Sequence, residues 1–258
     1  SNLSVSTDIE EFRQLEKVAK DTTDRSDEAF EKQKQFIGNA SHELQTPLAV
    51  LGNRIDLMLD NDTLSEENMG ELIKMKREIG HISRLNKTLL LLTKIDNGQF
   101  PEIRDIDFTG LVMHQKEIYD EIFISKKMIC NINTPDRMVY IRMNETLAIV
   151  LVSNLIKNAF VHGKDGGKIT ITLNSKALTI ENSGDSALDG ARIFERFYQG
   201  AKKEGSTGLG LALSKAIADR SGMELSYSFD NHTHIFRLSF PDSFQNHNIT
   251  LHKTKKKC

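Results

Sequence analysis

The chain has 258 residues, a formal net charge of -2 at pH 7, 38% hydrophobic residues and 27% charged residues. This composition is ordinary for a globular protein with one large or two small domains, and the small net charge gives no argument for a nucleic-acid partner. The two cysteines are too far apart for a C-x-x-C motif, which argues against a zinc site or a disulfide framework, and no apolar run approaches the roughly 20 residues of a membrane span.

Residues 1–29 are mostly polar and charged. Ile9, Phe12, Leu15 and Val18 recur at a spacing of three, which indicates a helical stripe. This segment is predicted to be a helical connector from an upstream module or the frayed remnant of a truncated helix.

Residues 30–98 predict a helical hairpin. Apolar residues recur every three or four positions over residues 36–58 and again over residues 72–92, which is the pattern of two amphipathic helices. Residues 61–63 interrupt the pattern, and Ser65 is placed to cap the second helix. Such a hairpin leaves an apolar seam, so two chains are expected to form a dimeric four-helix bundle through this segment.

A hinge is predicted at residues 98–101, and after it strands and helices alternate. This mixture predicts a two-layer α/β sandwich with a mixed sheet over residues 105–243. The basic tail, residues 244–258, is expected to be disordered. The predicted helices cover residues 146–160 and 207–221, and the predicted strands cover residues 168–173, 177–181, 225–229 and 234–240.

The most informative residue of the hairpin is His42. It lies two residues from both Ala40 and Leu44, which predicts that it points to solvent, opposite the apolar stripe. A neutral imidazole is a nucleophile near pH 7, and the adjacent Glu43 can hold the other ring N–H and accept its proton. Pro47 removes one helical hydrogen bond and permits a bend.

The run Ser41-His42-Glu43-Leu44-Gln45-Thr46-Pro47 resembles the H box of sensor histidine kinases, usually H-E-L-R-T-P, with Gln45 in place of the arginine. The resemblance implies that His42 accepts a phosphoryl group from ATP. Thr46 lies one turn after His42 on the same helix face. In the family, a Thr or Asn here orients the water that attacks the phosphorylated regulator; the alternative is a hydroxyl bonded to the carbonyl of residue 42.

Asn154 and Asn158 share one face of a predicted helix, and residues 154–159 resemble the N box of the same family. Amide oxygens are hard, neutral ligands suited to Mg²⁺. The resemblance assigns the metal to Asn158 and the nucleotide to both asparagines and to His162, which stands where the family commonly has Tyr. Taken alone, two asparagines on a solvated helix face would be the simpler interpretation.

Asn182 and Gly184 lie in a run that resembles the first glycine box, usually D-x-G. In the family the Asp accepts a hydrogen bond from the amino group of adenine. Here Asn182 takes its place, and an amide oxygen can still accept, without the assistance of a charge. Gly184 permits close approach of the base to the backbone.

Residues 193–197 resemble the F box, although phenylalanines three apart also suit simple helix packing. The second glycine box follows after a short lid. Its glycines allow backbone N–H groups to face phosphates at the start of a helix. The nucleotide-binding residues implied there are Thr207, Gly208, Leu209 and Gly210.

The resemblance covers roughly residues 30–240. It implies a dimerisation and phosphotransfer hairpin followed by a GHKL (Bergerat) ATP-binding domain, with ATP and Mg²⁺ as cofactors. It implies transfer of the γ-phosphoryl group of ATP to His42 and then to an Asp of a response-regulator receiver domain, together with phosphatase activity. It also implies a homodimer whose catalytic part is cytoplasmic, in a protein anchored in the bacterial inner membrane by an upstream sensor segment.

Two other functions remain compatible with the sequence. Another GHKL ATPase, such as a chaperone, mismatch-repair or topoisomerase subunit, would share the asparagine and glycine boxes but lack the hairpin with its H box. A degenerate kinase acting as a scaffold or phosphatase is the second, because Val161, Asn182 and Gln199 replace family residues and missing cations weaken phosphate binding. The lysines that could compensate are Lys157, Lys164, Lys202 and Lys203.

Overall fold

The computed structural model divides into two compact units, residues 1–79 and 80–258. The backbone is described for residues 5–60, 64–134, 138–200 and 207–242. Within the first helix, the side chains of residues 5–11, 25–37 and 42 lie outside the description. The predicted disordered tail and the predicted break at residues 61–63 therefore lie outside the described residues.

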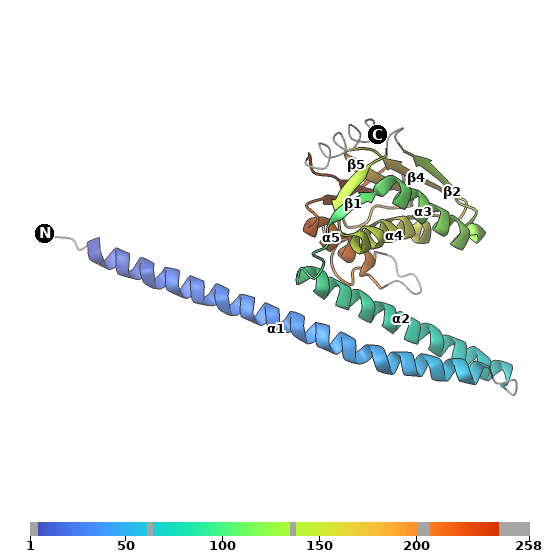
Figure 1. Cartoon of the computed structure of the whole chain (residues 1–258), viewed down its shortest axis with the longest axis horizontal. Helices are drawn as coiled ribbons and strands as arrows, with labels where there is room; N and C mark the ends of the chain where they lie inside the picture. Colours follow the sequence, from blue (N-terminus) through green and yellow to red (C-terminus); the bar gives the residue numbers. More distant parts are fainter. Residues whose placement is uncertain (1–4, 61–63, 135–137, 201–206, 243–258) are drawn as a thin grey trace, which may run out of the picture. The chain divides into compact units, whose positions relative to one another are not determined.

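The first unit contains α1 (Val5–Leu59) and the start of α2 (Glu66–Asp96), which form the predicted hairpin (Figure 1). α1 is one continuous helix of 55 residues, so the predicted connector and the predicted hairpin share a helix without a break at residue 29. Ser65 caps α2 as predicted, since its hydroxyl accepts the N–H of Asn68 (3.3 Å). An ion pair between Lys76 and Asp56 (2.5 Å) joins the two helices.

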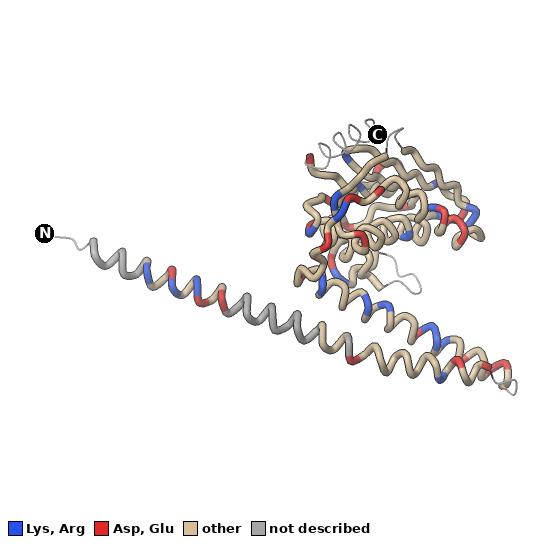
Figure 2. Tube along the Cα trace, viewed as in Figure 1, with Lys and Arg blue, Asp and Glu red and all other residues tan. Residues whose placement is uncertain are grey.

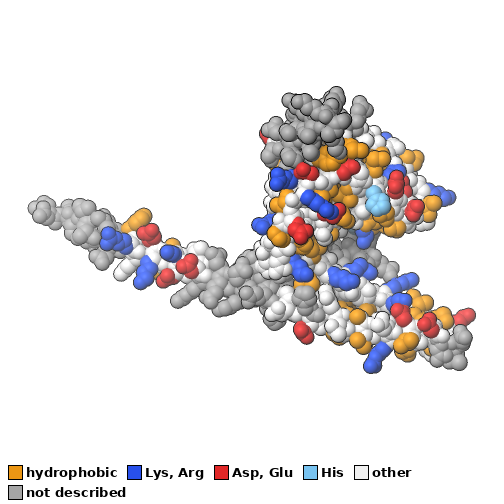
Figure 3. Space-filling view, viewed as in Figure 1, with side chains coloured by type: hydrophobic (Ala, Val, Ile, Leu, Met, Phe, Trp, Pro, Cys, Tyr) orange, Lys and Arg blue, Asp and Glu red, His pale blue; other side chains and the backbone are white. Residues whose placement is uncertain are grey.

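Much of the apolar stripe of the hairpin is exposed. Leu51, Met58 and Met75 are each about half exposed, whereas Ile55 and Leu72 are buried. Figure 3 shows hydrophobic side chains on the surface of the hairpin. An exposed stripe at helical spacing is what a helix presents when its partner surface is missing.

The hairpin also carries many charges. Figure 2 shows both signs on the described part of α1 that precedes residue 25 and a run of basic residues along the middle of α2. That run includes Lys74, Lys76 and Arg77, with Arg84 and Lys87 further on. Among the described helices, none combines the length and the apolarity that crossing a lipid bilayer requires.

The second unit is built on a five-stranded mixed sheet, as predicted, with the order β2-β4-β5-β7-β6. β2 and β4 are parallel, and the other neighbours are antiparallel. A separate antiparallel pair joins β1 (Arg104–Asp107) to β3 (Tyr140–Met143). The sheet strands are β2 (Ile129–Asn133), β4 (Lys168–Leu173), β5 (Ala177–Ser183), β6 (Glu224–Asp230) and β7 (Thr233–Ser239).

Three helices cover one face of this sheet (Figure 1). They are α3 (Phe108–Ile122), α4 (Glu145–His162) and α5 (Gly210–Arg220), and a short 3-10 turn, η1 (Ile124–Lys126), follows α3. α4 is central, since it contacts α3, α5 and β5. The result is the predicted two-layer α/β sandwich.

The two faces of the sheet differ in chemistry. Ile171, Ile180 and Leu238 point toward the helices and are almost fully buried. On the other face, Thr172, Thr179 and Arg237 stand side by side in the strand register. Alternation of this kind places the core between the sheet and the helices, and it leaves the second face polar.

The last turns of α2 belong to this second unit. Leu92 and Ile95 are buried in its core, and α2 ends at Asp96, next to the predicted stop at Gly98. Gly98 has φ +66°, a left-handed conformation that favours glycine, and its N–H donates to the carbonyl of Ile95 (3.0 Å). The compact division falls inside α2, between residues 79 and 80, whereas the predicted hinge at residues 98–101 follows the end of that helix.

Candidate functional site

α4 carries the two asparagines of the N box. Its start is fixed by Asn144, whose side chain accepts the N–H of Leu147 (3.2 Å). Asn154 and Asn158 are half-buried, while Leu151 and Leu155 on the same helix are buried in the core. The Nδ2 of Asn154 is buried and has no hydrogen-bond partner among the described residues, so it is a donor without an acceptor.

A lysine that was not predicted from the sequence caps the C-terminal end of α4. The Nζ of Lys126 donates to the carbonyls of Phe160 (2.9 Å) and Val161 (3.0 Å). A cation at a helix C-terminus pairs with the orphan carbonyls and with the negative end of the helix dipole. His162, the last residue of α4, thus lies on a fixed helix end. Lys126 belongs to no motif, so only a three-dimensional structure could assign this contact.

Asn182 lies within β5, which runs two residues beyond the predicted end at residue 181. Its side chain points to the helix layer and is 1% exposed. Its Nδ2 donates to the carbonyl of Ser183 (3.4 Å), and its Oδ1 has no hydrogen-bond partner among the described residues. Leaving a buried acceptor unpaired costs about 1–3 kcal/mol, so this oxygen suits a donor supplied by a ligand.

Next to Asn182 lies His234, a second residue that the sequence analysis missed. The two are directly paired in the register of β5 and β7. His234 is buried, which lowers the pKa of its imidazole, and its Nε2 lies only 2.0 Å from the place of a Cβ on Gly184. Gly184 is therefore required by a close approach, although in this structure the approaching group is a side chain of the protein.

The F box is not helical, so the interpretation of Phe194 and Phe197 as helix packing was wrong. Residues 190–197 form successive turns, with Ile193 buried and Phe197 58% exposed. Phe197 has φ +66°, and its N–H donates to the carbonyl of Gly208 (2.9 Å). The F box and the second glycine box are thus hydrogen-bonded to each other across the short lid.

The second glycine box forms the turn before α5, which begins at Gly210, three residues after the predicted start. Gly208 has φ +67°, and a Cβ there would lie 2.7 Å from the carbonyl carbon of Phe197. The hydroxyl of Thr207 accepts the N–H of Leu209 (3.3 Å). Leu209, the N-cap residue, makes no side-chain hydrogen bond to the helix, so N–H groups of the first turn remain available to an anion.

The predicted compensating lysines are only partly placed. Lys164 forms an ion pair with Asp185, and Lys157 is exposed on α4. Lys202 and Lys203 lie outside the described residues. Arg196 of the F box pairs with Asp96 at the end of α2 (3.2 Å). The charges of Lys164 and Arg196 are thus already balanced by carboxylates of the protein.

These features fit a nucleoside triphosphate. The unpaired Oδ1 of Asn182 can accept from a base, and the turn at Gly208 with the uncapped start of α5 can receive phosphates. Asn158 presents a half-buried amide on the helix that contacts both β5 and α5, which is suitable chemistry for Mg²⁺.

The hairpin residues of the H box lie on α1. Glu43 and Thr46 are exposed, and Ser41 is buried. The predicted orientation of the His42 side chain falls outside the described side chains. Exposure of Glu43 and Thr46 leaves both groups accessible to an incoming reactant.

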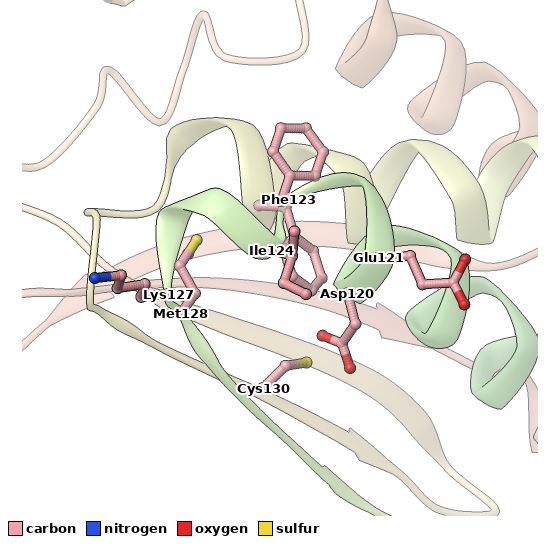
Figure 4. A pocket seen from close by; sticks show the side chains of 8 residues that line it. Asp120, Glu121, Phe123, Ile124, Lys127, Met128 and Cys130 are labelled. Atoms are coloured by element: carbon pink, nitrogen blue, oxygen red, sulfur yellow. The ribbon is translucent and has the colours of Figure 1, made fainter.

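A pocket of about 430 Å³ lies elsewhere, between α3, η1 and β2 (Figure 4). None of the predicted site residues lines it. Burial raises the pKa of the Cys130 thiol to about 11, so this cysteine is protonated at neutral pH and is a poor nucleophile. The pocket therefore carries no chemistry comparable to that of the motif residues. Its lining consists of Asp120, Glu121, Phe123, Ile124, Lys127, Met128, Cys130 and Phe160.

Two family models match separate segments of the chain. Residues 32–98 match the His Kinase A (phospho-acceptor) domain. Residues 143–243 match the family described as histidine kinase-, DNA gyrase B-, and HSP90-like ATPase. The presence of the first match argues against the alternative of an ATPase without a phospho-acceptor hairpin.

Individual relatives are sensor proteins. The chain is 35% identical over 191 residues to the heme sensor protein HssS of Staphylococcus saprophyticus, covering 70% of this chain and 40% of that protein. It is 31% identical over 202 residues to the sensor histidine kinase RppB of Synechocystis, covering 74% of this chain and 44% of that protein. The chain thus spans less than half the length of these two curated relatives.

Solved structures show the same fold. Full-length ShkA in complex with AMPPNP has a TM-score of 0.66 and 22% identity, covering 80% of this chain and 45% of that one. The Acinetobacter baumannii histidine kinase AdeS has a TM-score of 0.54 and 23% identity, covering 77% and 96%.

Proposed function

Since this chain belongs to the two-component sensor histidine kinases, we propose that it transfers the γ-phosphoryl group of ATP to His42 and then to an aspartate of a response-regulator receiver domain. The observation that carries the ATP-binding step is the buried, unpaired Oδ1 of Asn182. An adenine amino group is a hydrogen-bond donor, and it would satisfy this acceptor.

Each site residue has a role in this proposal. Asn154, Asn158 and His162 of α4 face the nucleotide, with Asn158 as the ligand of Mg²⁺, which would neutralise phosphate charge when bound. Thr207, Gly208, Leu209 and Gly210 hold the phosphates at the start of α5. Asn182 and Gly184 hold the base.

The phosphoryl acceptor lies on the hairpin. A neutral imidazole of His42 attacks the γ-phosphorus while the bond to the leaving oxygen of ADP breaks. The exposed carboxylate of Glu43 accepts the ring proton that is lost as the second ring nitrogen becomes phosphorylated. Catalysis in such a transfer is mostly positioning and charge stabilisation, so the protein supplies orientation more than covalent chemistry.

The exposed stripe of the hairpin supports a homodimer. Leu51, Met58 and Met75 would be buried if two hairpins packed as a four-helix bundle. Light scattering at micromolar concentration tests this assembly, and a stable monomer would contradict it.

A second candidate is a kinase with weak ATP binding that acts mainly as a phosphatase or scaffold. It is favoured by the neutral amide of Asn182 and by the pairing of Lys164 and Arg196 with carboxylates. Both features reduce the charge available to a triphosphate.

Incubation with ATP labelled at the γ-phosphate and Mg²⁺ distinguishes the two. Label that is acid-labile and base-stable, and that is lost in His42→Gln while nucleotide binding persists, supports the kinase. His81→Gln is the matched control, because His81 also lies on the hairpin but lacks the flanking glutamate and proline. Absence of label in the wild type, with ATP still bound, would favour the phosphatase or scaffold.

A further inference from the structure

Asn182 alone does not define which base is bound. A carboxylate only accepts hydrogen bonds, whereas an amide accepts through Oδ1 and donates through Nδ2. An amide could therefore pair with the amino group of adenine or, turned over, with the O6 of guanine. A second group is needed to fix the choice.

His234 stands beside Asn182 and shares a hydrogen bond with Tyr227. The hydroxyl oxygen of Tyr227 accepts the backbone N–H of Leu188 (2.9 Å) and lies 2.9 Å from Nδ1 of His234. A hydroxyl donates one proton and accepts through two lone pairs, so while it accepts from Leu188 it can also donate its own proton to Nδ1. Burial lowers the pKa of His234, so the ring is neutral, and a neutral ring that accepts at Nδ1 carries its proton on Nε2.

Nε2 of His234 makes no hydrogen bond among the described residues, and it lies against Gly184, 2.0 Å from the place of a Cβ there. The same face of the sheet holds the unpaired Oδ1 of Asn182, one strand away in direct register. Neighbouring strands thus present an unpaired acceptor, Oδ1 of Asn182, and, when Nδ1 accepts from Tyr227, a donor at Nε2 of His234. The amide of Asn182 is held in this orientation, because its Nδ2 donates to the carbonyl of Ser183 (3.4 Å).

We propose that His234 is a base-reading residue, which donates from Nε2 to the ring nitrogen N1 of adenine while the adenine amino group donates to Oδ1 of Asn182. The inference rests on the proposed ATP-binding function and adds its specificity-determining residue. Adenine presents an amino donor beside the N1 acceptor, which complements this pair. Guanine presents O6 beside N1–H. Its O6 acceptor would face the Oδ1 acceptor, and its N1–H donor would face the Nε2–H donor, so it is disfavoured.

Tyr227 is a positioning residue in this arrangement. It does not reach the base, but its hydroxyl selects the tautomer of His234. Tyr227→Phe removes one oxygen and keeps the ring that stacks near His234 (centroids 5.9 Å apart). Without the hydroxyl, the ring can carry its proton on Nδ1 and offer an acceptor at Nε2.

The test compares the affinity of the full chain for Mg-ATP and for Mg-1-deaza-ATP, which lacks N1. Wild type is expected to bind ATP about tenfold more tightly, the effect of one hydrogen bond whose protein partner is otherwise left unpaired. His234→Asn keeps an acceptor for the Tyr227 hydroxyl but lacks the Nε2 atom, so this preference should vanish. In His234→Gln an amide N–H reaches the position of Nε2, so this variant should restore part of the preference for ATP over 1-deaza-ATP.

Tyr227→Phe is the variant that least disturbs the fold. It should lower the preference for ATP over 1-deaza-ATP and the preference for ATP over GTP. The proposal is overturned if His234→Asn or Tyr227→Phe retains the full wild-type preference. It is also overturned if His234→Asn binds ATP more tightly than wild type, since the imidazole would then occupy the place of the base. Wild type that binds neither nucleotide contradicts the proposed function itself, whereas tight ATP binding without a preference for N1 contradicts only the role of His234.

Discussion

The backbone N–H of Phe197 donates to the carbonyl of Gly208 (2.9 Å), and both residues have left-handed backbone conformations. The two ends of the short lid are therefore held by one close backbone contact. Residue 208 can hardly be other than glycine, because a Cβ would lie 2.7–2.9 Å from backbone atoms of Phe197.

Gly208→Ala should lower the free energy of unfolding by about 1–3 kcal/mol, the usual cost of a strained left-handed residue with a steric clash. ATP affinity should fall with it, because the turn before α5 must shift. Urea unfolding measures the first effect. Gly210→Ala is the control for stability, since a Cβ there meets nothing within 4 Å; equal stability losses in the two variants would contradict the role of the Phe197 contact.

Asn158→Ala should weaken Mg²⁺-dependent ATP binding by at least about tenfold, because even partners outside the ligand shell contribute 10–100-fold to metal sites. The fold should survive, as Asn158 is half-buried and no hydrogen bond from its side chain is found among the described residues. Titration with ATP in Mg²⁺ and in EDTA checks this, with Lys157→Ala, an exposed neighbour, as the control. A loss of the same size in EDTA would mean that Asn158 does not act through the metal.

Thr46→Ala should keep His42 labelling but slow dephosphorylation of the regulator by about 10²–10⁴-fold, the effect of losing a positioned catalytic group. The exposed hydroxyl of Thr46 is accessible to water, as this role requires. Thr22→Ala is a matched control, since Thr22 is also exposed on α1 and donates to the carbonyl of Val18 (2.7 Å). The assay is the decay of phosphorylated regulator, and equal decay with wild type and Thr46→Ala would reject the role.

The buried imidazole of His234 predicts a pH dependence of stability. Burial lowers its pKa in the folded state, so the unfolded state binds the proton more readily. The free energy of unfolding should therefore fall as the pH drops below about 6.5, the ordinary value for histidine. Urea unfolding at pH 8 and at pH 5.5 measures this, and the fall should be smaller in His234→Asn. An identical fall in both proteins would show that other groups are responsible.

The elements that the sequence predicted best have strong local signals. The hairpin β6–β7 was expected around residues 230–231, and the structure places Asn231 and His232 in its turn with φ +46° and +58°. Such positive values match the turn type that two-residue hairpins prefer. The long apolar period over residues 146–160 likewise predicted α4 to within two residues.

Segments without such signals were not predicted. Residues 104–143 contain β1, α3, β2 and β3, and none was assigned from the sequence. In β2 the residues Ile129 and Asn131 point to the same, exposed face, so the alternation of apolar and polar residues fails at this edge of the sheet. For the F box, helix packing was left open as an alternative, because a spacing of three residues suits turns as well as helices.

The site shows a similar division. The residues within motifs were predicted from the sequence. His234 was not, because it contacts Asn182 and Gly184, which are distant in sequence. Lys126 was not, because it binds carbonyls at the end of α4. A pairwise contact between strands leaves no trace in a single sequence. The packing of α2 into the second unit was missed for the same reason, since Leu92 and Ile95 continue the period of the hairpin.

The unbroken course of α1 has a consequence for how a signal could arrive at His42. Val5 and His42 lie on one helix, about 55 Å apart at 1.5 Å per residue. Their angular phase about the helix axis is thus fixed, and one extra residue between them would turn one end relative to the other by about 100°. Seven extra residues would nearly restore the phase. A rigid rotation of the helix applied near Val5 would therefore reach residue 42 with its sense preserved.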